Sequence, residues 1–237
     1  MDAEKEKELD YKKWHDMGLY TRVRHDPFDS KSERRICVIL NHILQDYDLE
    51  TVMQIRLLPE QTLDNYLWIG ESDTDNPFRS YFLNKNKWMK FDFLFVQVYE
   101  HKEQMHYIPV AVVEFDGPDH QKEKQRQLDA YKDGVAENIG AGMVRIPYET
   151  VPGLDEALVR SKYEDPILKA IITGYFTESK NFRKEGKLIG QAQEGRFQFL
   201  RKAYTERAEK SPDKADFYRK MLELLEEAKE KWTKSGN

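Results

Sequence analysis

Acidic residues interrupt two of the most apolar stretches of the chain. Asp92 lies in the middle of the run F-D-F-L-F, and Glu114 and Asp116 end the run V-V-E-F-D-G. Side chains alternate along a strand, so Glu114 and Asp116 should project from one face of a sheet and Phe115 from the other. If the two runs pair as antiparallel strands, Asp92 joins the other two acids. Three carboxylates would then lie close together.

Crowded carboxylates in apolar surroundings are electrostatically costly unless a cation lies among them. A hard divalent cation such as Mg²⁺, bound by carboxylate oxygens and a main-chain carbonyl, is the simplest compensation. In the alternative interpretation, Glu114 and Asp116 lie at an exposed strand end and Asp92 pairs with an arginine. The spacing alone leaves both interpretations open.

The periodicity of the chain predicts the elements that position these acids. Both acid-bearing runs are almost continuously apolar, which is typical of strands covered on both faces by helices. A polar, hairpin-like connection joins them. Ser32 is expected to cap the first helix of this part, and Pro59 to stop its first strand. The predicted order is helix 30–47, strand 51–58, strand 88–99, strand 107–116, helix 122–138 and strand 143–146.

The remaining parts of the chain are predicted from composition and helical spacing. One helix is expected at 4–17, an irregular insertion at 63–87, and helices from position 154 onward. Ser211 and Pro212 mark a helix start, followed by an apolar stripe from Phe217 to Trp232 that is typical of packing. We expect an N-terminal arm at 1–29, a core domain at 30–150 and a helical C-terminal region at 151–237.

The composition of the 237 residues excludes several classes of protein. Hydrophobic residues make up 39% of the chain, which argues against disorder, and the net charge of −5 excludes a uniformly basic surface. The single cysteine, Cys37, rules out an internal disulfide or a cysteine-based zinc site, and we expect it in the core. Without a signal peptide or a long apolar run, the sequence predicts a soluble cytoplasmic protein with no membrane partner.

The motifs, taken in order over about 30–150, resemble the PD-(D/E)XK nucleases. Within that superfamily they are similar to very-short-patch repair endonucleases and their uncharacterised bacterial relatives, which carry an E-x-D-x-x-x-H motif. The opening Ser32-Glu33-Arg34 also resembles the start of the family's first helix. The further matches are Asp92-Phe93, Val113-Glu114-Phe115-Asp116, His120, Asp129-Ala130-Tyr131-Lys132-Asp133 and Val144-Arg145-Ile146.

This resemblance implies an α/β fold, with a restriction-endonuclease-like mixed four-stranded sheet flanked by helices and a C-terminal helical extension. It implies metal-dependent hydrolysis of phosphodiester bonds in nucleic acid, DNA rather than RNA. The metal, Mg²⁺ or Mn²⁺, would be held by Asp92, Glu114 and the main-chain carbonyl of Phe115. A bound cation of this kind clamps the phosphate and lowers the pKa of a water molecule.

The chain departs from the family pattern at the usual E-x-K lysine, which Asp116 replaces. His120 is the first substitute, as a general base or a group that positions water. Lys132, on the following helix, is the second. Glu33 joins the candidate site through the resemblance, although an acid in a first helical turn is stabilised by the helix dipole in any case.

Asp129 and Asp133 lie four residues apart on the helix expected at 122–138. Two like charges at this spacing repel each other unless they are solvated or neutralised. They form a solvated helix face, or Asp129 orients His120 or a basic residue near the site.

Basic residues decide whether a polyanion could approach. Positive charge and phenylalanines are interleaved between positions 179 and 202, as in nucleic-acid grooves, although a solvated basic helix is the commoner outcome. Two alternatives therefore stay open: an inactive nuclease-fold module that binds nucleic acid, and an interaction subunit of a defence or repair assembly. In the latter, the C-terminal helices would bind a protein partner or a second copy. The candidate nucleic-acid contacts are Lys122, Lys124, Arg126, Lys180, Arg183, Lys184, Lys187 and Arg196.

Overall fold

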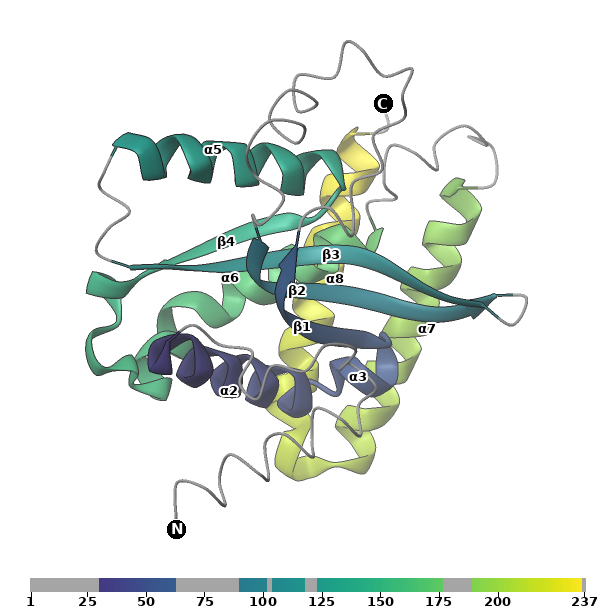
Figure 1. Cartoon of the computed structure of the whole chain (residues 1–237). Coiled ribbons are helices and arrows are strands. Elements are labelled where there is room, and N and C mark those ends of the chain that lie inside the picture. The colour runs from purple at the N-terminus through teal and green to yellow at the C-terminus, as the bar shows by residue number, and fades with distance from the viewer. Residues whose placement is uncertain (1–29, 63–89, 102–103, 118–122, 177–188, 236–237) are drawn as a thin grey trace, which may run out of the picture.

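The computed structural model describes residues 30–62, 90–101, 104–117, 123–176 and 189–235 (Figure 1). The helix predicted at 4–17 and the insertion predicted at 63–87 lie outside these residues. Each helix within the described ranges is too short or too polar to cross a lipid bilayer.

The centre of the fold is a four-stranded mixed sheet in the order β1-β2-β3-β4. The first three strands are antiparallel neighbours, and β4 runs parallel to β3. The predicted α/β class and the mixed four-stranded sheet are therefore confirmed. The strands are β1 (Ile55–Thr62), β2 (Lys90–His101), β3 (Gln104–Asp116) and β4 (Gly142–Pro147).

Helix α2 (Lys31–Asp46) begins two residues earlier than its predicted cap implies. Ser30, not Ser32, caps it: the Ser30 hydroxyl accepts the Glu33 N–H at 3.1 Å, and the Glu33 carboxylate accepts the Ser30 N–H at 2.9 Å. This reciprocal pair is a capping box, which satisfies two backbone donors at once. The prediction of a Ser32 cap was wrong.

The predicted first strand was placed too early. Thr51 and Val52 belong to the short helix α3 (Leu49–Val52), and β1 then runs through Pro59 instead of stopping there. Because β1 is an edge strand, a proline without an N–H can sit in it while pairing with Phe93 of β2. The next two strands and the strand at 143–146 lie where the sequence predicted them, and β2 and β3 extend further into the hairpin.

The two faces of the sheet are covered unequally (Figure 1). Helix α5 (Glu123–Asn138) covers one face over a small apolar cluster that contains Leu94, Val112 and Val135. The other face packs against α2, α6 (Glu156–Phe176) and the C-terminal helices in a much larger cluster, in which the buried Cys37 lies as predicted. The expectation that both faces are covered is confirmed.

Helix α6 approaches the sheet closely at one glycine. A Cβ atom on Gly174 would overlap the carbonyl group of Val110 in β3, so only glycine allows this spacing. Gly142, at the start of β4, likewise leaves room for Ala170 of the same helix. The backbone of α6 therefore packs directly against β3 and β4, and β3 is the strand that carries Glu114 and Asp116.

The C-terminal helices α7 (Ile189–Lys210) and α8 (Ala215–Ser235) are tied to the turn between α2 and α3. Asp48 in that turn accepts hydrogen bonds from Arg207 at 3.1 Å and from the Tyr218 hydroxyl at 2.8 Å. Met221 and Leu225 are buried, so the apolar stripe packs as predicted. As predicted, Ser211 stands at the start of a helical segment with Pro212 in its first turn, here a 3₁₀ turn (Pro212–Lys214), but the Ser211 side chain makes no capping bond.

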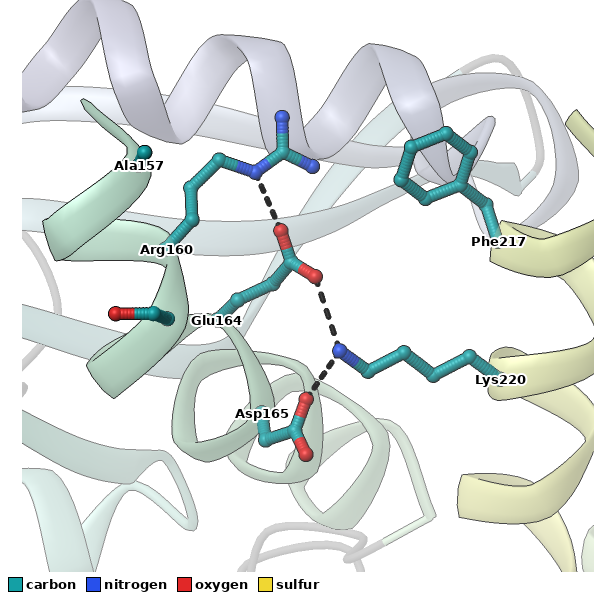
Figure 2. Close-up of a pocket in the computed structure, with 7 residues that line it drawn as sticks. Ala157, Arg160, Glu164, Asp165, Phe217 and Lys220 are labelled. Atoms are coloured by element: carbon teal, nitrogen blue, oxygen red, sulfur yellow. Dashed lines mark hydrogen bonds and ion pairs between the residues drawn. The ribbon is translucent and has the colours of Figure 1, made fainter.

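Glu164 fastens α6 to the helices on both sides of it. Its carboxylate accepts hydrogen bonds from Tyr47 at 2.6 Å, Arg160 at 2.5 Å and Lys220 at 3.0 Å. Lys220 also pairs with Asp165, and Figure 2 shows that these charged groups bond to one another around a pocket between α6 and α8. Burial alone would raise the pKa of Glu164, but the three hydrogen bonds hold it below its ordinary value.

We expect Glu164→Gln to lower the free energy of unfolding at pH 7 by about 1–3 kcal/mol, because its donors lose a charged acceptor. The wild-type contribution is complete above the pKa of an unfolded glutamate, about 4.3, and is lost as the pH falls through the lower folded-state value. Urea unfolding at several pH values should therefore show the difference between variant and wild type shrinking towards pH 3. Glu223→Gln, at an exposed acid on α8, is the control. A difference that stays constant with pH would contradict this role.

Candidate functional site

Asp92 and Glu114 meet on the face of the sheet that α5 covers. Phe93 pairs with Val113 in the β2–β3 ladder, and the two acids come next in their strands. The Asp92 N–H donates to Glu114 Oε1 at 3.2 Å, and the Phe115 N–H donates to Asp92 Oδ2 at 2.9 Å. Each carboxylate thus accepts a main-chain hydrogen bond from the opposite strand. The predicted antiparallel pairing is confirmed, and it brings these two acids together.

Lys132 of α5 reaches the same point from above the sheet. Its ammonium group donates to Glu114 Oε2, and only 12% of its side chain is exposed, while the Glu114 side chain is fully buried. This contact ties α5 to the end of β3. Lys132, the second candidate for the role of the missing E-x-K lysine, therefore contacts the buried acid directly.

The electrostatics of this cluster follow from burial and from two acids sharing one lysine. Burial and the negative charge of Asp92 raise the pKa of Glu114 to about 8, although Lys132 opposes this. Burial alone would lower the pKa of Lys132, but Glu114 and Asp92 raise it overall, so the ammonium group stays charged at neutral pH. The cluster holds two carboxylates against one cation, and the second acid makes ionisation of the first costly.

These residues fit a hard divalent cation. Asp92 is half-buried, and its Oδ1 accepts no hydrogen bond from any residue that the structure describes. Carboxylate oxygens are the preferred ligands of Mg²⁺ and Mn²⁺, and a cation would favour the ionised form of Glu114, which burial and Asp92 disfavour. The predicted third ligand is the main-chain carbonyl of Phe115, the residue after Glu114 in β3.

Asp116 is directed to an arginine. Arg145 of β4 donates to Asp116 Oδ1 at 2.7 Å, and its guanidinium group also bonds Asp133 at 2.8 Å and the main-chain carbonyl of Asp129 at 3.0 Å. The Asp129 carboxylate lies 3.5 Å from the same group. Asp129 therefore contacts a basic residue near the site, in agreement with the second interpretation of the spacing, and Asp133 bonds the same arginine.

The remaining predicted site residues are placed differently. Glu33 lies in the capping box of α2, on the opposite side of the sheet from α5 (Figure 1). Arg126 is exposed on α5, and the Arg196 guanidinium carbon lies 5.8 Å from the centre of the Tyr175 ring. Among described residues, no three His, Cys, Asp or Glu side chains form a metal-binding group. Outside the description lie His120, Lys122, Lys180, Arg183, Lys184, Lys187 and the side chain of Lys124.

Two residues near the site were missed as site members by sequence reasoning. Arg145 was noted only as part of a motif, although an arginine in a short apolar strand signals a buried acidic partner. Glu60 of β1 lies between the residues that pair with Phe93 and Phe91, and its carboxylate pairs with Lys90. It was missed because the strand was expected to stop at Pro59.

We expect Lys132→Met to lower the free energy of unfolding by about 3 kcal/mol, because it leaves two facing acids without their cation. Adding Glu114→Gln should recover part of this loss, since only Asp92 then carries a negative charge. Urea midpoints of the two single variants and the double variant measure the coupling. A loss in the double variant equal to the sum of the two single losses would mean that the pair is not coupled.

Comparison with known proteins does not identify a relative of this chain. No family model matches it, and neither the search of curated proteins nor that of solved structures gave a significant match. The fold stands as an α/β structure with a mixed sheet, and functional inference rests on the geometry around Asp92, Glu114 and Lys132.

Proposed function

We propose that the protein is a metal-dependent nuclease that hydrolyses phosphodiester bonds in DNA. One observation carries this proposal above the others: Asp92 and Glu114, from neighbouring strands, share a buried site with the ammonium group of Lys132. Two acids and a lysine at one point are the groups that phosphodiester hydrolysis with a divalent cation needs. A purely structural cluster would gain nothing from the second acid, which raises the cost of ionising the first.

Asp92, Glu114 and the carbonyl of Phe115 would hold Mg²⁺ or Mn²⁺. When bound, such an ion polarises the scissile phosphate and makes a water molecule more acidic. The main-chain bonds between β2 and β3 fix the orientation of the two carboxylates before any ligand arrives. The site is in this sense preorganised, so little reorganisation is needed during the reaction.

Lys132 performs the role of the E-x-K lysine, whose position Asp116 occupies in this chain. Its ammonium group stays charged at neutral pH and lies on a metal-binding acid, where it would hold a phosphate oxygen or orient water. Because it comes from α5 and not from β3, the lysine reaches the site from a different element. The contact of Lys132 with Glu114 supports Lys132 in this role.

The order of elements also supports the proposal. A helix, three antiparallel strands, a helix and a strand parallel to the third agree with the fold that the motif resemblance implies. The motif residues Asp92, Glu114, Lys132 and Arg145 all converge on the face under α5. Four motif residues that are far apart in the sequence therefore lie close together on one face of the sheet.

An inactive nuclease-fold module that binds nucleic acid is the second candidate. The observation that favours it is the internal pairing of charges: Lys132 lies on Glu114, and Arg145 lies on Asp116. A cluster so nearly balanced has less need of a metal. This candidate predicts salt-dependent binding of nucleic acid that is independent of divalent ions.

We expect purified protein to cleave DNA with Mg²⁺ or Mn²⁺ and to lose cleavage with a chelator. Asp92→Asn and Glu114→Gln should each reduce the rate at least about 100-fold, and Lys132→Met about 100- to 1,000-fold. Plasmid, linear and single-stranded DNA assayed by gel electrophoresis provide the measurement. Glu223→Gln, at an exposed acid on α8, should cleave as the wild type does. Wild-type protein that leaves all three substrates intact would refute the proposal.

Metal binding can be tested separately from cleavage. Calorimetric titration of the wild type with Mn²⁺ should show one site that Asp92→Asn weakens at least about tenfold, because one carboxylate ligand is lost. Glu223→Gln again serves as the matched loss of one acidic charge. Equal heats in wild type and Asp92→Asn would instead support the inactive binding module.

A further inference from the structure

Arg145 connects three segments that surround the candidate site. It pairs with Glu114 in the parallel β3–β4 ladder, so its side chain projects from the sheet next to that of the buried acid. Its guanidinium group then bonds Asp116 at the end of β3 and both Asp129 and Asp133 on α5. One planar cation thus joins β3, β4 and α5, and the fork geometry of arginine suits several acceptors at once.

Lys132 lies between the two helix acids that Arg145 holds. Positions 132 and 133 follow position 129 by three and four residues, so the side chain of Asp129 neighbours both of them on the surface of α5. The apolar cluster beneath α5 is the smaller of the two, and from the described side chains of the helix it includes the buried Val135 and Ala136 and the partly buried Tyr131. The ionic bonds of α5 to the sheet add to this apolar contact in setting the angular position of the helix.

From this geometry we infer that Arg145 is a positioning residue that holds the Lys132 ammonium group on Glu114. Its bonds to Asp129 and Asp133 fix the turn of α5 that carries Lys132, and its bond to Asp116 fixes the guanidinium group over β3. Asp116 accordingly serves as an anchor for Arg145 and not as a metal ligand. The value of this arrangement for catalysis rests on the proposed nuclease function, whereas the placement of Lys132 is testable without any activity.

The test measures how well Lys132 is protected from an amine reagent. Wild type, Arg145→Met and Arg145→Lys are pulsed with acetic anhydride, and mass spectrometry gives the acetylation rate of Lys132 relative to the exposed Lys202. We expect Arg145→Met to raise that relative rate about tenfold through local opening, and Arg145→Lys to raise it less. Asp133→Asn tests the same bond from the helix side and should also raise the rate.

Arg207→Met is the matched control, because it removes another arginine that bonds an aspartate between two elements, away from α5. It should leave the Lys132 rate within about twofold of wild type. The inference is overturned if Arg145→Met and Asp133→Asn leave Lys132 protected, or if Arg207→Met exposes it equally. Should Arg145→Met fail to fold, Asp133→Asn decides the question.

Cleavage supplies a second readout that a merely structural role would not produce. In protein that cleaves DNA, Arg145→Met should lower kcat with little change in KM, and it should have no further effect on kcat in a Lys132→Met background. Independent, multiplicative losses would overturn the inference. If no protein cleaves DNA, the nuclease proposal fails, while the acetylation result still decides the placement of Lys132.

Discussion

A carboxylate without access to water must be compensated by its neighbours, and Glu114 imposes this constraint on the whole α5 side of the molecule. The main-chain N–H of Asp92 and the ammonium group of Lys132 provide the compensation. The lysine must come from an element above the sheet, so α5 has to cross at this point. The position of α5 is therefore constrained by the bond between its Lys132 and the buried Glu114.

The unequal covering of the sheet makes this arrangement tolerable. On the face under α2 and α6, a large apolar cluster supplies most of the hydrophobic stabilisation. On the face under α5, polar groups interrupt a much smaller cluster. Burial of charge is unfavourable. The fully buried acid of the sheet, Glu114, lies on the face that contributes less to the apolar core. The larger apolar cluster and the buried pair of Glu114 and Lys132 thus lie on opposite sides of one sheet.

Local patterns predicted the acid-bearing strands and their antiparallel pairing, because alternation and apolar runs are properties of neighbouring residues. They failed where tertiary context decides: Pro59 is tolerated only because β1 is an edge strand, and Ser30 competed with Ser32 for the same cap. The partner of Asp116 could not be predicted either. It depends on the parallel register of β3 and β4, which sets Arg145 beside Glu114 and is not encoded in any short segment.

The bonds of Asp48 to α7 and α8 have a consequence for how the chain divides. The large apolar cluster contains Ile36 and Leu44 from α2 together with Tyr204 and Met221 from the last two helices. A polypeptide ending near position 150 would keep α2 but would expose the part of that face which α6, α7 and α8 cover. Trimming the protein to its motif-bearing portion would therefore yield a fragment that aggregates.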